Sequence, residues 1–239
     1  MNFSYLDENV SRCRATIETT CRDVGRDPTE VTLMAAIKSA DTDEINYIHE
    51  VLGVHHVGEN RVQQLLSRYE ALHKEGMTIH FIGTLQTNKV KYIIDKVDMI
   101  QSLDSKKLAD EIEKQAAKVG RVMDVLIEIN AGEEDAKSGV RPCDAEDLAM
   151  LVTGGKYPHL RLRGFMTMAP KCDSDEIYRM HFANVRAVSE DIWSRLPYAQ
   201  ENMILSMGMS DSFVPATMEG ATLVRVGRSL FHKPDTETP

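Results

Sequence analysis

The chain has 239 residues, of which 42% are hydrophobic and 27% are charged, and its net charge is −9 at pH 7. This composition is typical of a globular protein, and the negative charge argues against nucleic acid or an anionic membrane as the main partner. The four cysteines form no CxxC pair, the acidic start lacks the apolar region of a signal peptide, and no apolar run could span a bilayer. We therefore expect a cytoplasmic protein with reduced thiols.

Hydrophobic spacing changes repeatedly between the strand period and the helix period along the chain. An opening helix is predicted over about residues 3–24, followed by eight strands that each lead into a helix. The predicted strands are 31–37, 54–58, 78–83, 97–103, 123–130, 160–168, 203–208 and 222–227. The predicted helices are 41–52, 60–75, 88–96, 105–120 with Asp104 as N-cap, one from about 142, 174–196, one from about 211, and 229–232.

Alternating strands and helices predict a parallel sheet with crossover helices. Eight such units in roughly 210 residues are typical of a closed (β/α)8 TIM barrel. We expect one barrel over about residues 31–231, within a single domain 1–239 that ends in a short polar tail. An open doubly wound sheet is the alternative, but the GxGxxG motif that usually follows its first strand does not occur.

Barrel enzymes build their sites at the C-terminal ends of the strands, and one lysine of this chain falls there. Lys38 ends the first predicted strand and shares the parity of Met34 and Ala36, which are expected to face the barrel axis. Such a lysine is either an amine available for attack on a carbonyl or a strand-end lysine whose charge reaches solvent.

Small and hydroxyl residues end the seventh and eighth predicted strands, at Ser206, Gly208, Gly227 and Ser229. Phosphate sites in these barrels use the loops after those two strands, where backbone N–H groups must approach the anion closely. Ordinary turn chemistry is the alternative for either loop alone. Both loops together, at the same end of the barrel as Lys38, favour a phosphorylated ligand.

Arg225 shares the parity of Leu223 and Gly227 and is expected to face the same end of the barrel. A buried arginine needs an acceptor, which would be either a carboxylate such as that of Glu128 or a ring nitrogen of a ligand. A lysine that can form a Schiff base, a phosphate cup and a partner for a pyridine nitrogen are together what pyridoxal phosphate requires.

Seven stretches of the chain, taken in order, closely resemble the pyridoxal phosphate homeostasis protein family over about residues 3–232. They are AAIKSADTDEI, VGENRVQQL, IHFIGTLQTNKVK, INAGEEDAKSGV, RGFMTMAP, LSMGMSDSF and EGATLVRVGRSLF. The resemblance implies a barrel like the N-terminal domain of alanine racemases, with pyridoxal 5'-phosphate held as a Schiff base on Lys38. It also implies phosphate contacts and ring contacts at Ser206, Met207, Gly227, Arg228, Arg225 (opposite the pyridine nitrogen) and Asn60 (near the ring).

Two stretches depart from the family pattern. Arg228 stands where the family usually has threonine, so it either adds a charged contact or turns its side chain to solvent and offers only its N–H. After Lys38, SADTD replaces a more usual TKP-like run and removes a neighbouring lysine that would otherwise accept or relay the cofactor. Lys89 and Lys91 are interpreted as solvated helix residues, although one of them could attract the anionic cofactor.

The family is regarded as carrying or buffering pyridoxal phosphate, with dependent apoenzymes as recipients, and without an established turnover. A permanently charged arginine disfavours protonation of the ring nitrogen, and a two-base racemase needs a second acid/base. Alanine racemases take that group from a C-terminal domain, which we expect to be missing here. We therefore favour a monomeric carrier without a metal site over an amino-acid racemase or lyase, and over a Schiff-base aldolase acting on a sugar phosphate.

Overall fold

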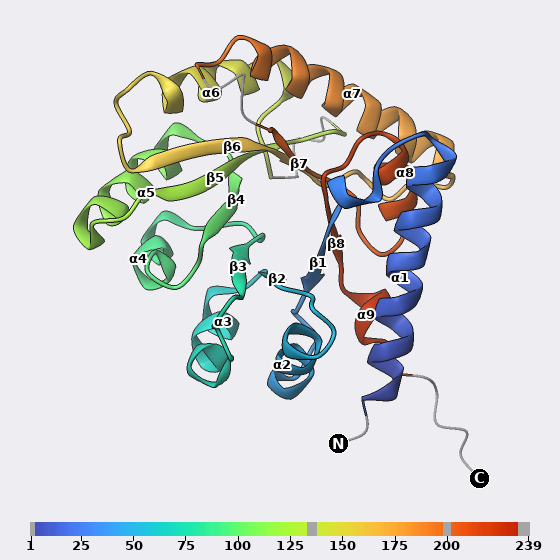
Figure 1. The fold of residues 1–239 in the computed structure, drawn as a ribbon. Coiled ribbons are helices and arrows are strands. Elements are labelled where there is room, and N and C mark those ends of the chain that lie inside the picture. The colour runs from blue at the N-terminus through green and yellow to red at the C-terminus, as the bar shows by residue number, and fades with distance from the viewer. Residues whose placement is uncertain (1–2, 133–137, 198–201, 234–239) are drawn as a thin grey trace.

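Eight parallel strands form a closed barrel in sequence order in the computed structural model, which describes residues 3–132, 138–197 and 202–233 (Figure 1). The predicted (β/α)8 barrel is confirmed. The strands are β1 (Thr32–Ala36), β2 (His56–Glu59), β3 (Thr78–Phe81), β4 (Met99–Leu103), β5 (Met123–Ile129), β6 (Leu160–Thr167), β7 (Ile204–Ser206) and β8 (Leu223–Val226).

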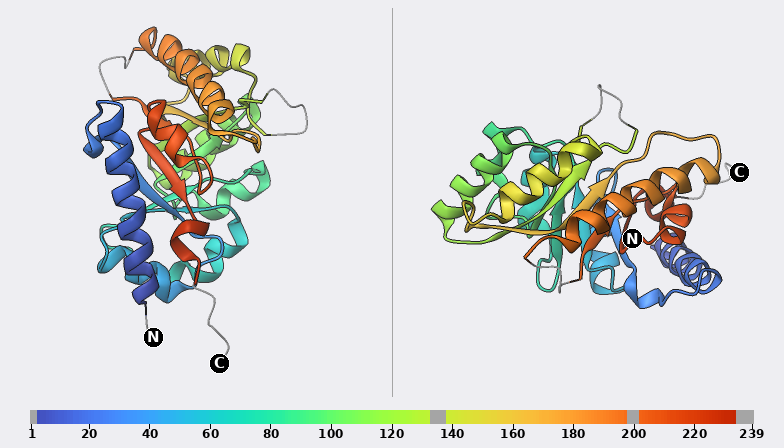
Figure 2. Two further views of the ribbon diagram at one scale, coloured as in Figure 1. Left: turned by 90° about the vertical axis from the view of Figure 1, so that its right-hand side faces the viewer. Right: turned by 90° about the horizontal axis from the view of Figure 1, so that it is seen from above.

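Helices surround the barrel on its outer side (Figures 1 and 2). They are α1 (Ser4–Asp23), α2 (Thr42–Glu50), α3 (Val62–Arg68), α4 (Val90–Ile93), α5 (Lys106–Val119), α6 (Ala145–Thr153), α7 (Asp175–Ser194), α8 (Phe213–Met218) and α9 (Arg228–Phe231). Short 3-10 turns cover Pro28–Glu30, Tyr69–Ala71, Thr87–Lys89 and Pro142–Asp144. The opening helix α1 lies along α9, where Asn9 Nδ2 donates to Leu230 O at 2.9 Å and to His232 O at 3.0 Å.

Some predicted boundaries were wrong. The helix expected over residues 60–75 ends at Arg68 and continues only as a 3-10 turn. Asp104 is not the N-cap of α5, because the Ser105 hydroxyl accepts the hydrogen bond from Leu108 N. The Asp104 side chain instead accepts from Ser105 Oγ at 3.0 Å and lines a cavity at the barrel mouth. Serine and aspartate are about equally good N-caps, so the sequence could not rank these two adjacent residues, and the structure shows that Ser105 is the cap.

The apolar core has two parts, as strand alternation requires. One set of strand side chains packs outward against the helices and includes Ala35, Ile37 and Val226. The other set fills the barrel interior, with Met34, Ile82 and Leu223 in one cluster and Met99, Leu126 and Met166 in another. Met34 therefore faces the axis, as its parity predicted.

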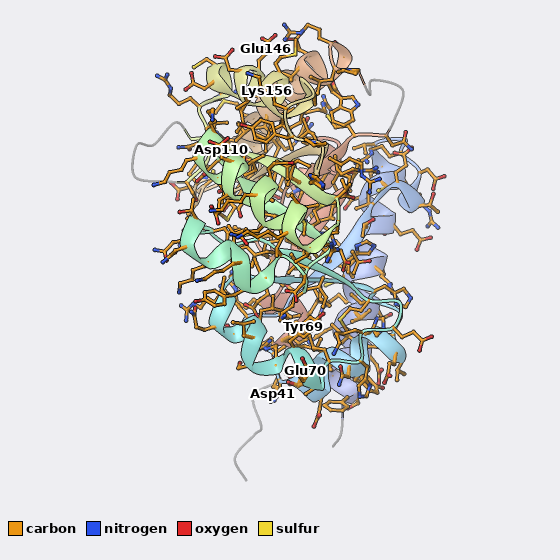
Figure 3. All side chains as sticks on the ribbon, turned by 90° about the vertical axis from the view of Figure 1, so that its left-hand side faces the viewer. Asp41, Tyr69, Glu70, Asp110, Glu146 and Lys156 are labelled. Atoms are coloured by element: carbon orange, nitrogen blue, oxygen red, sulfur yellow. The ribbon has the colours of Figure 1, made fainter. Side chains whose placement is uncertain are left out.

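A capping box begins α2, directly after the lysine of β1. Asp41 is the N-cap, and Glu44 Oε2 accepts a hydrogen bond from Asp41 N at 2.7 Å. The buried Glu44 also accepts from the Tyr5 hydroxyl and lies 3.0 Å from Lys233 Nζ. In the SADTD stretch, Asp41 therefore starts a helix, and Glu44 of that helix ties it to both ends of the described chain. Asp41 lies at the same end of the molecule as Tyr69 and Glu70 (Figure 3).

None of the helices in the described residues is long and apolar enough to cross a membrane. The same part of the chain also contains no group of three or more His, Cys, Asp or Glu side chains placed to hold a metal ion.

Candidate functional site

Lys38 lies two residues beyond the end of β1, at the C-terminal mouth of the barrel, and its side chain is exposed. Two side chains of α3 hold the backbone on which it sits. Gln64 Nε2 donates to Lys38 O at 2.6 Å, and Arg68 Nη1 donates to Ile37 O at 2.8 Å. The amine is thus carried by a fixed turn, which favours the functional interpretation over a loose strand-end lysine.

The loop after β2 is organised by Glu59, whose side chain is fully buried. Its Oε1 accepts from Asn60 N at 2.7 Å and from Arg61 N at 3.1 Å, while Oε2 lies 3.5 Å from Arg68 Nη1. Burial raises the pKa of Glu59, and these N–H groups and the two arginines oppose that rise. Within the GENRVQ motif (residues 58–63), Glu59 therefore fixes the loop that presents Asn60 and Arg61 and lies against Arg68, which supports the turn of Lys38.

A cavity of about 710 Å³ opens over the ends of β1, β2 and β3. Lys38, Asn60 and Arg61 line it from one side, and Thr84 and Lys89 from the loop after β3. Asn60 Oδ1 is buried and has no hydrogen-bond partner in the described structure. Such an acceptor is costly to leave unsatisfied, and a donor from a ligand would satisfy it.

Arg225 lies inside the barrel near the mouth, and only 3% of its surface is exposed. Its Nη1 donates to Ser206 Oγ and its Nη2 to Thr167 O, each at 2.6 Å. Burial lowers the pKa of Arg225 to about 10 despite the opposing charge of Glu128, so the guanidinium stays positive at neutral pH. Of its two predicted partners, the Glu128 carboxylate is not a direct contact, because a hydroxyl and a carbonyl accept from Arg225. The ring nitrogen of a ligand stays a prediction.

The hydrogen bonds of Arg225 continue across the barrel interior through side chains that the sequence interpretation did not include. Ser206 Oγ donates to Gln101 Oε1 at 2.7 Å, and Gln101 Nε2 lies 3.0 Å from His80 Nδ1. His80 Nε2 lies 3.0 Å from His56 Nδ1. Burial lowers the pKa of His80 to about 3, with a smaller effect from His56, so this chain of side chains is neutral beyond Arg225. The sequence carried a signal for this network, because His80 and Gln101 are polar residues at inward positions of β3 and β4.

The predicted phosphate-loop residues are placed differently from one another. The Ser206 hydroxyl is committed to Gln101 and Arg225, below the mouth. The Met207 side chain packs in the outer apolar layer, since it alternates with Ser206. The Arg228 side chain is 71% exposed and pairs with Asp211, which matches the alternative that it turns to solvent.

Ser210 joins the loops after β7 and β8. Its Oγ accepts from Gly227 N at 3.3 Å and from Ser229 N at 3.2 Å. A Cβ on Gly227 would lie 2.9 Å from Ala36 O, so only glycine fits there without a shift. The loop after β8 thus directs two N–H groups at one oxygen acceptor, which is the donor arrangement that a phosphate oxygen needs.

A second cavity of about 680 Å³ lies over the ends of β4, β5 and β6 and meets the first at Thr84. Its acidic residues are Asp104 and the buried Glu128, whose Oε1 accepts from Ser138 Oγ at 3.0 Å. Burial raises the pKa of Glu128 to about 7, with a contribution from Asp104, while the Ser138 hydrogen bond and Arg225 oppose the rise. Two methionines, Met168 and Met209, also line this cavity.

Comparisons with known proteins agree with this barrel. A family model described as alanine racemase, N-terminal domain, matches residues 9–234. A pyridoxal phosphate homeostasis protein from Aquifex aeolicus is 41% identical over 224 residues, which cover 94% of this chain and 96% of that protein. PipY of Synechococcus elongatus PCC7942, solved with PLP bound, has a TM-score of 0.73 at 29% identity, covering 90% of this chain and 99% of its own. Alanine racemase from Corynebacterium glutamicum (TM-score 0.66, 14% identity, 100% of this chain and 64% of its own) shares the fold.

The closed parallel barrel, the mouth lysine and the family model together define a (β/α)8 barrel of the alanine racemase N-terminal-domain type. Within that class, the chain belongs to the family of pyridoxal phosphate homeostasis proteins.

Proposed function

We propose that this protein holds pyridoxal 5'-phosphate on Lys38 and acts as a carrier in pyridoxal phosphate homeostasis. The observation that carries the proposal is the Lys38 amine at the mouth, held on a fixed turn and without a hydrogen-bond or ion-pair partner in the described part of the chain. The name of the Aquifex relative and the PLP bound in PipY support it.

The residues at the mouth fit this cofactor. The buried Asn60 Oδ1 lacks a donor, and the buried Arg225 offers N–H donors beyond its two hydrogen bonds. Two N–H groups of the β8 loop converge on Ser210 Oγ, whose place a phosphate oxygen would take. Lys38, Asn60, Arg225 and the backbone of Gly227 and Arg228 would hold the ligand. Ser206 would contribute by orienting Arg225, because its hydroxyl accepts from that side chain.

Pyridoxal phosphate, when bound, supplies an aldehyde that condenses with a lysine amine with loss of one water. Arg225 has no lone pair to accept a proton and remains charged at neutral pH. Facing a ring nitrogen, it would favour the unprotonated form and so weaken the ring as an electron sink. This property suits a protein that holds the cofactor more than one that uses it for turnover.

Substitution of Lys38 tests the proposal. The purified parent should show the near-visible absorption of a pyridoxal Schiff base, and borohydride should fix a phosphopyridoxyl group on the peptide that contains Lys38. Lys38→Ala should lose both signals, whereas Lys107→Ala, an exposed lysine of α5, should keep both. A Lys38→Ala protein that retained the band and the reducible adduct would refute the assignment.

We further propose that the protein is cytoplasmic and monomeric, and that its recipients are pyridoxal-phosphate-dependent apoenzymes. The four cysteines are free, which suits a reducing compartment. Loaded protein mixed with an apoenzyme should restore the activity of that enzyme faster than the same amount of free cofactor does, when both mixtures contain a buffer that traps free cofactor. Equal rates would indicate simple release in place of delivery.

An amino-acid racemase or lyase is the second candidate, and one observation favours it. Glu128 is buried, lines the second cavity and has a pKa of about 7, which is suited to general acid–base catalysis near neutral pH. Sustained turnover of any amino acid, abolished by Glu128→Gln, would favour this enzyme over the carrier.

A further inference from the structure

The cavity over the ends of β1, β2 and β3 is lined by positive charge from three separate loops. Lys38 follows β1, Arg61 follows β2, and Lys89 ends the 3-10 turn after β3. Lys89 is half-buried and donates to Gln63 Oε1 at 3.0 Å, which directs its amine toward the same cavity. The neighbouring Lys91 is exposed, lies 4.9 Å from the Tyr92 ring and does not line the cavity.

These three cations have no carboxylate partner among the residues that the structure describes. Elsewhere on the surface, exposed arginines pair with aspartates, as in Arg141–Asp144 and Arg161–Asp124. The one carboxylate beneath the loop, Glu59, is buried and lies 3.5 Å from Arg68. Arg61 acts on Glu59 only at longer range, without an ion pair between them. In a chain of net charge −9, three cations without a carboxylate in ion-pair distance around one cavity concentrate a positive potential where an anion can reach it.

The other half of the mouth has the opposite sign. Asp104 and Glu128 line the second cavity, and the two cavities meet at Thr84. An incoming anion is attracted to the β1–β3 side and repelled from the β4–β6 side. The loops after β7 and β8, where Gly227 N and Ser229 N donate to Ser210 Oγ, contribute no described lining residue to the cavity over β1–β3, so a phosphate held at those loops would lie apart from Lys89 and Arg61.

We propose that Lys89 and Arg61 form a capture site for the phosphate group of an incoming phosphate monoester, distinct from the resident phosphate place at the loops after β7 and β8. The inference rests on the proposed function, since it gives the capture site its purpose. Held by Lys89 and Arg61, the phosphate would bring the rest of the molecule next to Lys38, which lines the same cavity. The capture site then acts on the rate of association and leaves the final complex unchanged.

Association kinetics test the capture site. Cofactor-free full-length protein is mixed with pyridoxal phosphate, and the growth of the Lys38-dependent absorption is followed at low and high salt. Lys89→Gln should slow association by about threefold to tenfold at low salt and flatten its salt dependence. Because the final complex is unchanged, the equilibrium affinity and the final spectrum should stay the same, and dissociation should slow by the same factor as association. Lys91→Gln is the matched control, one charge removed two residues away, and should associate like the parent. Pyridoxal, which lacks the phosphate, should react equally with all three proteins.

Three results would overturn the capture site: parent-like association in Lys89→Gln, an equal slowing in Lys91→Gln, or slowing toward pyridoxal as well. Faster dissociation of Lys89→Gln would place Lys89 in the resident site and would equally overturn it. If the parent forms no Lys38 adduct, the proposed function fails. Calorimetric titration with inorganic phosphate then still tests whether Lys89 and Arg61 bind an anion. Phosphate should bind more weakly to Lys89→Gln than to the parent and equally to Lys91→Gln and the parent.

Discussion

Ser206 is the residue at which the polar network of the barrel interior branches. Its hydroxyl accepts from Arg225 and donates to Gln101, and its side chain is fully buried. The sequence pointed to this serine as a phosphate contact because it ends the seventh strand. The structure shows a hydroxyl that bonds both Arg225 and Gln101 and so holds Arg225 in place, while the phosphate contact stays a prediction.

Removing that hydroxyl should destabilise the protein. Ser206→Ala leaves the Gln101 carbonyl and one Arg225 N–H without partners in a buried setting, which should cost about 2–4 kcal/mol of unfolding free energy. Ser189 of α7 offers a matched control, because its hydroxyl is equally buried but has no hydrogen-bond partner in the described structure. Ser189→Ala should change stability by less than about 0.5 kcal/mol. Urea unfolding of both variants checks this, and equal losses would contradict the role of Ser206.

At the scale of elements, the short helices α2 and α3 fix the mouth. Helix α3 holds the backbone of Lys38 through Gln64 and Arg68. Asp41, the N-cap of α2 in the Asp41–Glu44 capping box, follows that lysine by three residues. Neither helix is long enough to be stable by itself. Their caps and tertiary contacts therefore decide how rigidly the lysine is presented.

Loss of the N-cap of α2 should weaken the protein measurably. Asp41→Ala removes the cap and should cost about 1 kcal/mol, whereas Asp41→Asn should retain most of the stability because asparagine caps equally well. Asp43→Ala removes an exposed first-turn carboxylate of the same helix and should cost no more than about half as much. Thermal or urea unfolding measures the three variants, and a loss in Asp41→Asn as large as in Asp41→Ala would argue against capping.

At the scale of the whole molecule, the barrel buries two titrating groups with opposite pH responses. The pKa of Glu128 is raised from 4.5 to about 7, so its contribution to stability is complete below pH 4.5 and is lost as pH rises through 7. The pKa of His80 is lowered from 6.5 to about 3, so its contribution is complete above pH 6.5 and is lost as pH falls toward 3. Between pH 7 and pH 5 the two effects oppose one another.

Single variants should separate these effects. On acidification from pH 7 to pH 5, Glu128→Gln should lose about 2 kcal/mol of unfolding free energy relative to the parent, because the gain from protonating Glu128 is removed. His80→Gln should change by a similar amount in the opposite direction. Unfolding free energies of the three proteins at both pH values check this. Parallel pH profiles would show that neither group has a shifted pKa.

The sequence by itself determined the barrel, its strand order and the position of Lys38 at the mouth. Alternation and strand–helix order are local properties, and eight repeated units leave few topologies. Inward parity also placed Arg225 and Met34 correctly. Helix ends such as Asp104 against Ser105 were open, because adjacent residues have nearly equal capping propensity and packing selects one.

Only the tertiary structure decided what each mouth residue contacts. Ser206, Gln101 and His80 lie far apart in the chain and meet because parallel strands place their inward side chains at neighbouring levels. The outward turn of Arg228 depends on Asp211 across a loop, and the separation of Lys89 from Lys91 depends on how one 3-10 turn faces a cavity. Such contacts depend on three-dimensional distance and burial, which cannot be read from the spacing of residues along a sequence.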